Sequence, residues 1–331
     1  MRKNRGFGLK VLAAAVSLSC ASAAHATLFN GTLYYTTYNG GPNVWDIAYS
    51  YDDSSNAFSL GSPNSIASTP GADGIIFAPN GNLLIGGQGT GKVFEVTTGG
   101  TIVGNQSTGY QSFHLTLDPS GSKVYTSDFG GPLNTVSIPI GSGSTTTSIT
   151  GDDRGLTQVA FGDGGSVFYV NGVPNGGGNL GTIDLATGVT TQLYSSVTPA
   201  HGLLYDPYTD LITMFGAGQT GTMNATDGSG LITSGTGVYG ACDFDQGAVD
   251  GSGHALVAGC NGITFIDYST SLDITNPDFT TTVFGFSAID DVAPLVGAGS
   301  NPNPAPEPAS LALVGLGLAG LARSRRRTAS A

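Results

Sequence analysis

The segment Ala72–Gly87 reads ADGIIFAPNGNLLIGG. Two runs of apolar residues flank a short stretch of Pro, Asn and Gly. Apolar, strand-prone runs separated by these turn-forming residues predict two short antiparallel strands joined by a tight turn. A single hairpin of this kind cannot bury its apolar residues alone, so its recurrence along the chain decides the fold.

Four further segments repeat the strand–turn–strand pattern, and a fifth repeats its first half. They are SFHLTLDPSGSKVYTSD, LTQVAFGDGGSVFYVNG, AHGLLYDPYTDLITMFG, DQGAVDGSGHALVAG and, for the half unit, FSAIDDVAPLVG. Alignment on the turn makes six positions equivalent, at spacings of 40, 44, 44, 44 and 45 residues: Asp73, Phe113, Thr157, His201, Asp245 and Asp290. A period of this length with about four strands per unit is typical of a β-propeller.

The two ends of the repeat region complete each other. The last unit supplies one strand before a Pro-rich segment begins, and the N-terminal region supplies three: GTLYYTTY, NVWDIAYS and AFSLGSP. One blade made from both ends would leave no open sheet edge. We therefore predict an all-β, six-bladed propeller with three-plus-one closure over residues 27–298. A β-sandwich is the alternative, but it would not produce this period.

The repeat units resemble those of NHL and YVTN-type propellers and, more loosely, six-bladed gluconolactonase and streptogramin-lyase-like proteins. The resemblance covers Leu28–Val296 and rests on the apolar pattern and the turns. It implies a fold more than an activity. The lactonase-like relatives use a Glu, Asn and Asp metal set, whereas the glutamates here are Glu95, on a predicted third strand, and Glu307 near the C-terminus.

Polar residues directly before the innermost strands of a propeller gather at one end of its central channel. The candidates for lining the channel are Asp73, His114, Gln158, His201, Asp245 and Asp290, with Asp243 and Asp291 adjacent to them. A divalent cation such as Ca²⁺, the one cofactor that the pattern suggests, would bind Asp73, His201, Asp245 and Asp290. The alternative is that these polar groups line a water-filled channel.

Cys242 and Cys260 flank one predicted hairpin at neighbouring ends. In an oxidising compartment we expect a disulfide between them, and two buried free thiols are the alternative.

The N-terminus has the pattern of a secretory signal peptide. Basic residues within Met1–Lys10 precede an apolar run, and Ala24-His25-Ala26 provides a cleavage site before Thr27. Residues 1–26 therefore predict a signal helix, with an uncleaved anchor as the alternative. An exported protein of this kind would meet a signal peptidase at the inner membrane.

Charge is distributed unevenly along the chain. Eight of the 11 basic residues lie in the first ten or the last nine positions, while all 23 acidic residues lie between Asp46 and Glu307. The body of the protein is therefore strongly acidic, which excludes a nucleic-acid partner because such a surface repels phosphates.

The C-terminus combines three features in fixed order. Pro306-Glu307-Pro308 lies in a Pro-rich linker (299–308), an apolar run of 14 residues extends from Ala309 to Ala322, and four arginines follow: Arg323, Arg325, Arg326 and Arg327. A bilayer-spanning helix usually needs about 20 residues.

Together these features resemble the PEP-CTERM sorting signal of Gram-negative bacteria that make extracellular polysaccharide. The resemblance implies a short transmembrane helix at 309–331, transient insertion in the inner membrane with the arginines inside, and cleavage by an exosortase. A permanent anchor is the alternative.

These patterns favour a non-enzymatic binding or structural module at the cell surface, at the outer membrane or in the extracellular matrix. Its partner would be extracellular polysaccharide or a surface protein, in a biofilm. The alternative is a secreted, metal-assisted lyase or lactonase that uses the Asp and His residues of the channel. Neither catalytic residues, nor a ligand, nor the final attachment, nor the oligomeric state can be identified from the sequence.

Overall fold

A computed structural model of the chain describes residues 28–38, 40–149, 155–173, 176–236, 239, 243–259 and 261–294. The predicted signal segment, the Pro-rich linker, the C-terminal sorting segment and both cysteines of the predicted disulfide lie outside these residues. Within the described residues, no helix has the length and apolar character required to span a membrane.

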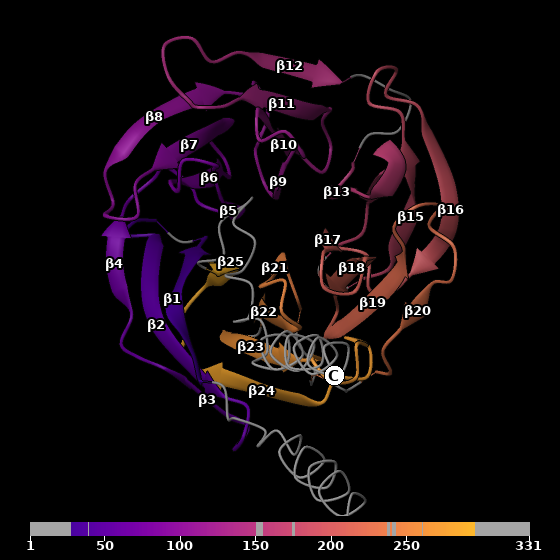
Figure 1. The fold of residues 1–331 in the computed structure, drawn as a ribbon. Coiled ribbons are helices and arrows are strands. Elements are labelled where there is room, and N and C mark those ends of the chain that lie inside the picture. The colour runs from indigo at the N-terminus through magenta and orange to yellow at the C-terminus, as the bar shows by residue number, and fades with distance from the viewer. Residues whose placement is uncertain are drawn as a thin grey trace, which may run out of the picture.

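Six antiparallel sheets are arranged radially around a central channel (Figure 1). We number them blades 1 to 6 in chain order. Blade 1 contains, from the channel outward, β25 (Ile289–Pro294), β1 (Leu28–Thr37), β2 (Val44–Asp52) and an outer strand in two pieces, β3 (Ala57–Leu60) and β4 (Asn64–Ala67). The other five blades each use four consecutive strands.

The strands of blades 2 to 4 also run outward in chain order. Blade 2 contains β5 (Ile75–Phe77), β6 (Leu83–Gly87), β7 (Lys92–Val96) and β8 (Ile102–Ser107). Blade 3 contains β9 (Leu115–Leu117), β10 (Lys123–Thr126), β11 (Leu133–Ser137) and β12 (Thr146–Ile149). Blade 4 contains β13 (Gln158–Phe161), β14 (Val167–Val170), β15 (Gly178–Ile183) and β16 (Thr190–Val197), with a single 3-10 turn at Asp163–Gly165.

Blades 5 and 6 complete the ring. Blade 5 contains β17 (Gly202–Asp206), β18 (Leu211–Gly216), β19 (Gln219–Asn224) and β20 (Ile232–Thr233). Blade 6 contains β21 (Gly247–Val249), β22 (His254–Gly259), β23 (Gly262–Asp267) and β24 (Phe279–Phe284). The six inner strands contact one another in a closed ring in the order β5, β9, β13, β17, β21, β25.

The predicted all-β, six-bladed architecture is confirmed, and its three-plus-one closure is observed. In blade 1, β25 pairs with β1 through Leu33 opposite Pro294 and Tyr35 opposite Val292. Figure 1 shows the indigo N-terminal strands and the yellow-orange β25 side by side in this sheet.

The turn at 78–82 shows why the repeat reads as it does. Ala78 and Asn82 close the hairpin through the bond from Ala78 N to Asn82 O (2.8 Å). Gly81 takes a positive φ of 84°, which a side chain would disfavour. The Asn80 side chain accepts a hydrogen bond from Asn82 N (3.1 Å) and so replaces a turn contact of the backbone.

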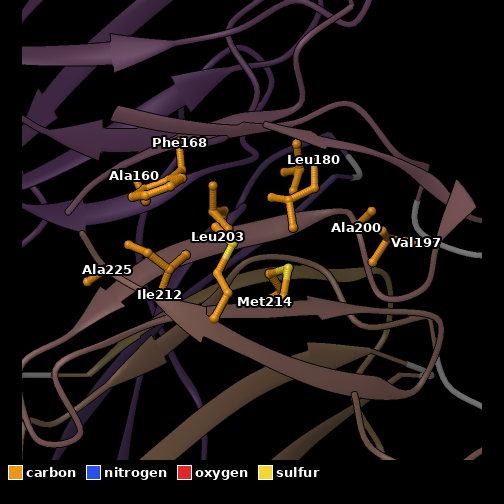
Figure 2. Packing of buried hydrophobic residues seen from close by; sticks show 11 residues of the cluster. Ala160, Phe168, Leu180, Val197, Ala200, Leu203, Ile212, Met214 and Ala225 are labelled. Carbon is orange, nitrogen blue, oxygen red and sulfur yellow. The ribbon is translucent and has the colours of Figure 1, made fainter. Parts of the chain in front are cut away.

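Apolar clusters between adjacent blades hold the ring together. Figure 2 shows the one between blades 4 and 5, where Phe168 and Leu180 of blade 4 pack against Leu203, Ile212 and Met214 of blade 5. All five side chains are almost completely buried. Burial of this kind stabilises by roughly 1.5–3 kcal/mol per large apolar side chain, so the blades are fixed relative to one another and to the channel.

Candidate functional site

The beginnings of the inner strands meet at one end of the channel, which we call the cluster face. Asp73 and Asp245 each lie two residues before an inner strand, and His114 and His201 each lie directly before one. Asp290 lies inside β25. The predicted convergence of these five side chains is therefore a property of the fold.

Two histidines share one carboxylate oxygen. His114 Nε2 lies 2.5 Å and His201 Nε2 lies 2.8 Å from Oδ1 of Asp245. The two imidazole rings meet edge to face, with 4.6 Å between their centroids. Burial tends to raise the pKa of Asp245, but attraction to His201 and His114 outweighs this and lowers the pKa of that carboxyl below its ordinary value.

Both histidines are almost completely excluded from solvent, with 2% of His114 and 1% of His201 exposed. Burial lowers the pKa of His114, although Asp245 opposes this shift. The Asp245 side chain is the most accessible member, with 18% of its surface exposed. The group is thus a His–Asp–His contact in which both histidines are almost completely buried and the carboxylate is partly accessible.

Three further aspartates crowd against this contact. Asp73, Asp290 and Asp291 are all buried, and burial raises the pKa of each well above the ordinary value, helped by mutual repulsion and by the charge of Asp245. The sequence indicates Asp291 only as a neighbour of Asp290, yet the Asp291 carboxylate accepts a hydrogen bond from Gln246 N (2.9 Å) and belongs to the cluster.

Gln158 does not join the histidines. Its Oε1 accepts from Leu203 N (2.7 Å) and its Nε2 donates to Leu115 O (3.3 Å), so it links blades 3, 4 and 5. Thr157, at the aligned position of this blade, donates to Gly172 O (2.7 Å). The described residues of blade 4 therefore contribute no ionisable group to the cluster.

Sequence reasoning missed two residues that support the site. Thr36, on β1, donates to Asp73 O (2.6 Å) and accepts from Asp291 N (3.2 Å). Phe129 stacks on Phe113 at 4.3 Å between centroids and lies 5.7 Å from the His201 ring, so it covers the histidines. Thr36 lies near the end of β1, the second strand of blade 1, and Phe129 follows β10, the second strand of blade 3. No regular spacing in the sequence points to either residue.

Close backbone contact fixes His114. A Cβ at Gly86 would lie 2.3 Å from Phe113 O, and one at Gly74 would lie 2.5 Å from the same atom. Real side chains do not fit at such distances, so only glycine lets blade 2 approach the start of β9 this closely. The position of His114 thus depends on two glycines of the neighbouring blade.

Below the cluster, the channel is a largely apolar cavity of about 380 Å³. Residues of all six inner strands line it, with Gln158 and Gln246 next to the cluster and Phe77, Phe161 and Tyr205 nearer the opposite face. His114, His201 and Asp245 do not line this cavity. The cluster therefore closes one end of the channel.

A groove of about 400 Å³ lies on the cluster face between blades 2 and 3. It is lined by Gly89, Thr90, Gly91, Ser107, Gly109, Tyr110, Gln111 and Asp128. The Tyr110 ring is 42% exposed, and Asp128 Oδ2 accepts a hydrogen bond from Gln111 N (3.2 Å). Gln88, next to this groove, donates to Asp73 Oδ2 (3.2 Å) and connects the groove to the cluster.

Among the described residues, Glu95 does not supply the glutamate of the metal set found in the lactonase-like relatives. Glu95 lies buried between blades 2 and 3, where its oxygens accept hydrogen bonds from Asn80, Asn82 and Ile140 N at 2.6–2.8 Å. Glu307 lies outside the described residues, as do Cys242 and Cys260 of the predicted disulfide.

A family model described as the PEP-CTERM protein-sorting motif matches residues 304–327. The chain carries a PEP-CTERM motif. The motif implies processing by an exosortase, and with it export and sorting to the cell surface or the extracellular space. No curated protein matches the chain by sequence.

Solved structures that are similar to the chain share little sequence with it. The putative TolB from Agrobacterium tumefaciens has a TM-score of 0.50 and 15% identity over 79% of this chain and 92% of that chain. Virginiamycin B lyase from Staphylococcus aureus has a TM-score of 0.49 and 11% identity over 79% and 89%. The Cps50 (Swd1) β-propeller domain from Myceliophteria thermophila has a TM-score of 0.47 and 10% identity over 78% and 88%. The likeness to the putative TolB concerns the fold alone. The likenesses to the lyase and to the Cps50 domain carry no conclusion about activity.

Proposed function

We propose that this protein is an exported, exosortase-processed binding module that holds extracellular polysaccharide at the cell surface or in a biofilm matrix. The sorting motif supports the route, and the closed propeller supports a binding or structural role rather than one that depends on moving parts. The observation that carries the choice of ligand is the groove on the cluster face.

The groove offers chemistry suited to sugars. Tyr110 presents an exposed ring on which an apolar sugar face can pack, while Thr90, Ser107, Gln111 and Asp128 supply hydroxyl, amide and carboxyl groups for sugar hydroxyls. Three glycines keep the floor of the groove free of side chains. A neutral or cationic polysaccharide would suit the acidic body of the chain better than a polyanion.

The test is binding of polysaccharide purified from the host's own culture, measured by affinity electrophoresis. Tyr110→Ala should abolish the retardation that the wild type shows. Tyr38→Ala is the matched control, because Tyr38 is also an exposed tyrosine, at 55%, and follows β1 outside the groove. Retardation that both variants lose equally, or that Tyr110→Ala keeps, would contradict the proposal.

A metal-assisted lyase or lactonase remains the second candidate, and one observation favours it: two imidazoles and a carboxylate converge within a few ångströms at the channel end. Such a group could polarise a carbonyl or accept a proton from a substrate. Lactone hydrolysis that requires added metal and disappears in His201→Gln would support this candidate. The same assay distinguishes it from the binding module, whose retardation in polysaccharide does not require turnover.

A further inference from the structure

Both ring nitrogens of His201 face hydrogen-bond acceptors. Its Nδ1 lies 3.1 Å from the carbonyl oxygen of Gly172, which can only accept, so Nδ1 carries a proton. In the neutral ring the lone pair of Nε2 then points at Asp245 Oδ1, only 2.8 Å away. Two acceptors at this distance repel each other unless a second proton or a cation lies between them.

His114 adds a second nitrogen to the same position. Its Nε2 also faces Asp245 Oδ1, at 2.5 Å, while its Nδ1 is fully buried without a hydrogen-bond partner. One carboxylate oxygen thus serves two imidazoles. A metal-binding histidine often donates its other ring nitrogen to a backbone carbonyl, as His201 does to Gly172.

Further carboxylates surround this group, and two of their oxygens have no hydrogen-bond partner among the described residues. Asp73, His114 and Asp291 form a second set whose possible ligand atoms lie within 4.8 Å of one another. Oδ2 of Asp291 and Oδ2 of Asp290 are buried and make no hydrogen bond to the described residues. An unpaired buried carboxyl oxygen is costly, and a bound cation would satisfy it.

The geometry points to a divalent transition-metal site of the zinc class, held by His114, His201 and Asp245 with Asp73 and Asp291 as nearby carboxylates. Two imidazole nitrogens suit Zn²⁺, whereas Ca²⁺ takes six to eight oxygen ligands. This changes both the metal and the ligand set expected from the sequence, because His114 enters it. The site does not depend on the polysaccharide groove.

Little movement is needed to admit the ion. Ligand atoms about 2.1 Å from a tetrahedral metal lie roughly 3.4 Å from one another. The nitrogens now lie 2.5 and 2.8 Å from Asp245 Oδ1, so the three side chains must separate by less than about 1 Å. Asp245, the most exposed member, provides the side from which an ion enters.

The experiment uses untagged protein purified after export, stripped of metal with a chelator and dialysed against Zn²⁺ or, separately, Ca²⁺. Mass spectrometric metal analysis should find one Zn²⁺ retained per chain and no stoichiometric Ca²⁺. Replacing Zn²⁺ with Co²⁺ should give the visible absorption of a tetrahedral site. These three measurements need no variant, so they test the site even where a substitution prevents folding.

Variants then test the ligands. His114→Gln and His201→Gln should each weaken Zn²⁺ binding by at least about tenfold, the smallest loss typical of residues that only support a metal site. His254→Gln is the matched control, because His254 is also buried beside an aspartate (Asp250, 2.7 Å) but belongs to neither candidate set of metal ligands. The proposal would be overturned if the wild type retained no Zn²⁺ or preferred Ca²⁺. It would also be overturned if a folded His201→Gln variant bound Zn²⁺ with unchanged affinity.

Discussion

Tyr35 and Val292 lie opposite each other in blade 1, although one belongs to the first strand of the propeller and the other to the last. Val292 is fully buried in a cluster that also contains Leu33 and Ile47. Blade 1 is therefore built from both ends of the repeat region, and the pairing of β25 with β1 closes the ring.

Removing Pro306–Ala331 should leave the thermal midpoint of unfolding unchanged, because the ring is already closed by β25, which ends at Pro294. A chain ending after residue 288 should instead lose its cooperative transition, since blade 1 would expose an unpaired strand and its buried cluster. Thermal unfolding followed by circular dichroism compares the two. A shorter chain that melts like the longer one would contradict the closure.

Glu95→Gln should lower the free energy of unfolding by about 1–3 kcal/mol. Both carboxylate oxygens of Glu95 accept hydrogen bonds from N–H groups. In glutamine one of these oxygens is replaced by an NH₂ group, which would face an N–H donor and could not accept its hydrogen bond. Asp227→Asn is the control, because this exposed residue accepts one hydrogen bond from Ser229 N that the amide oxygen can keep. Urea titrations measure both changes, and equal midpoints for the two variants would refute the role given to Glu95.

Stability should depend on pH through His254. Burial opposes its charge, but hydrogen bonding and attraction to Asp250, with attraction to Asp267 and Asp53, raise its pKa above the ordinary value of 6.5. A raised pKa means that the folded protein binds the proton more tightly than the unfolded chain. The stabilisation is therefore complete below pH 6.5 and is lost as pH rises through the folded pKa.

The measurement is the difference in unfolding free energy between wild type and His254→Gln across this range. The difference should be largest in acid and should shrink above the folded pKa of His254. Tyr51 shares Asp267 with this histidine, so Tyr51→Phe serves as a second variant that removes a neighbour without removing the titrating group. A difference that stays constant with pH would rule out the raised pKa.

Glu307→Ala should block processing without blocking insertion, because the apolar run and the arginines remain while the Pro-Glu-Pro element inside the matched motif is damaged. Unprocessed protein should then accumulate in the inner membrane of the native host, whereas deletion of Pro306–Ala331 should release the body without membrane retention. Fractionation with intact-mass measurement checks this. Mature wild-type protein that still carries Arg323–Arg327 would show that the tail is an ordinary anchor.

The blade count and closure could be predicted because they depend on local signals: turn residues at fixed offsets and a period set by the length of one blade. The composition of the cluster was harder to predict. Alignment on the turn makes Phe113 equivalent to Asp73 and His201, and the channel candidate His114 is its neighbour, so which of the two side chains enters the cluster depends on where β9 begins. The structure shows that His114 contacts Asp245.

Pairing between distant side chains could not be read from the sequence at all. The contact of His114 with Asp245 joins blades 3 and 6, which lie on opposite sides of the channel and meet there only because the ring closes. Thr36 reaches the site from a second strand. The burial of the two histidines could not be read from the sequence either, because it depends on how closely the neighbouring blades pack around them.

The direction of β25 determines the face of the ring at which the described chain ends. This strand begins at the cluster face, where Asp290 lies, and ends at Pro294 on the opposite face. The chain therefore leaves the ring on the side where the apolar cavity opens. Tyr110 and Asp245 lie at the other face, so whatever binds at Pro294's end of the ring leaves the groove and the cluster free to meet a ligand.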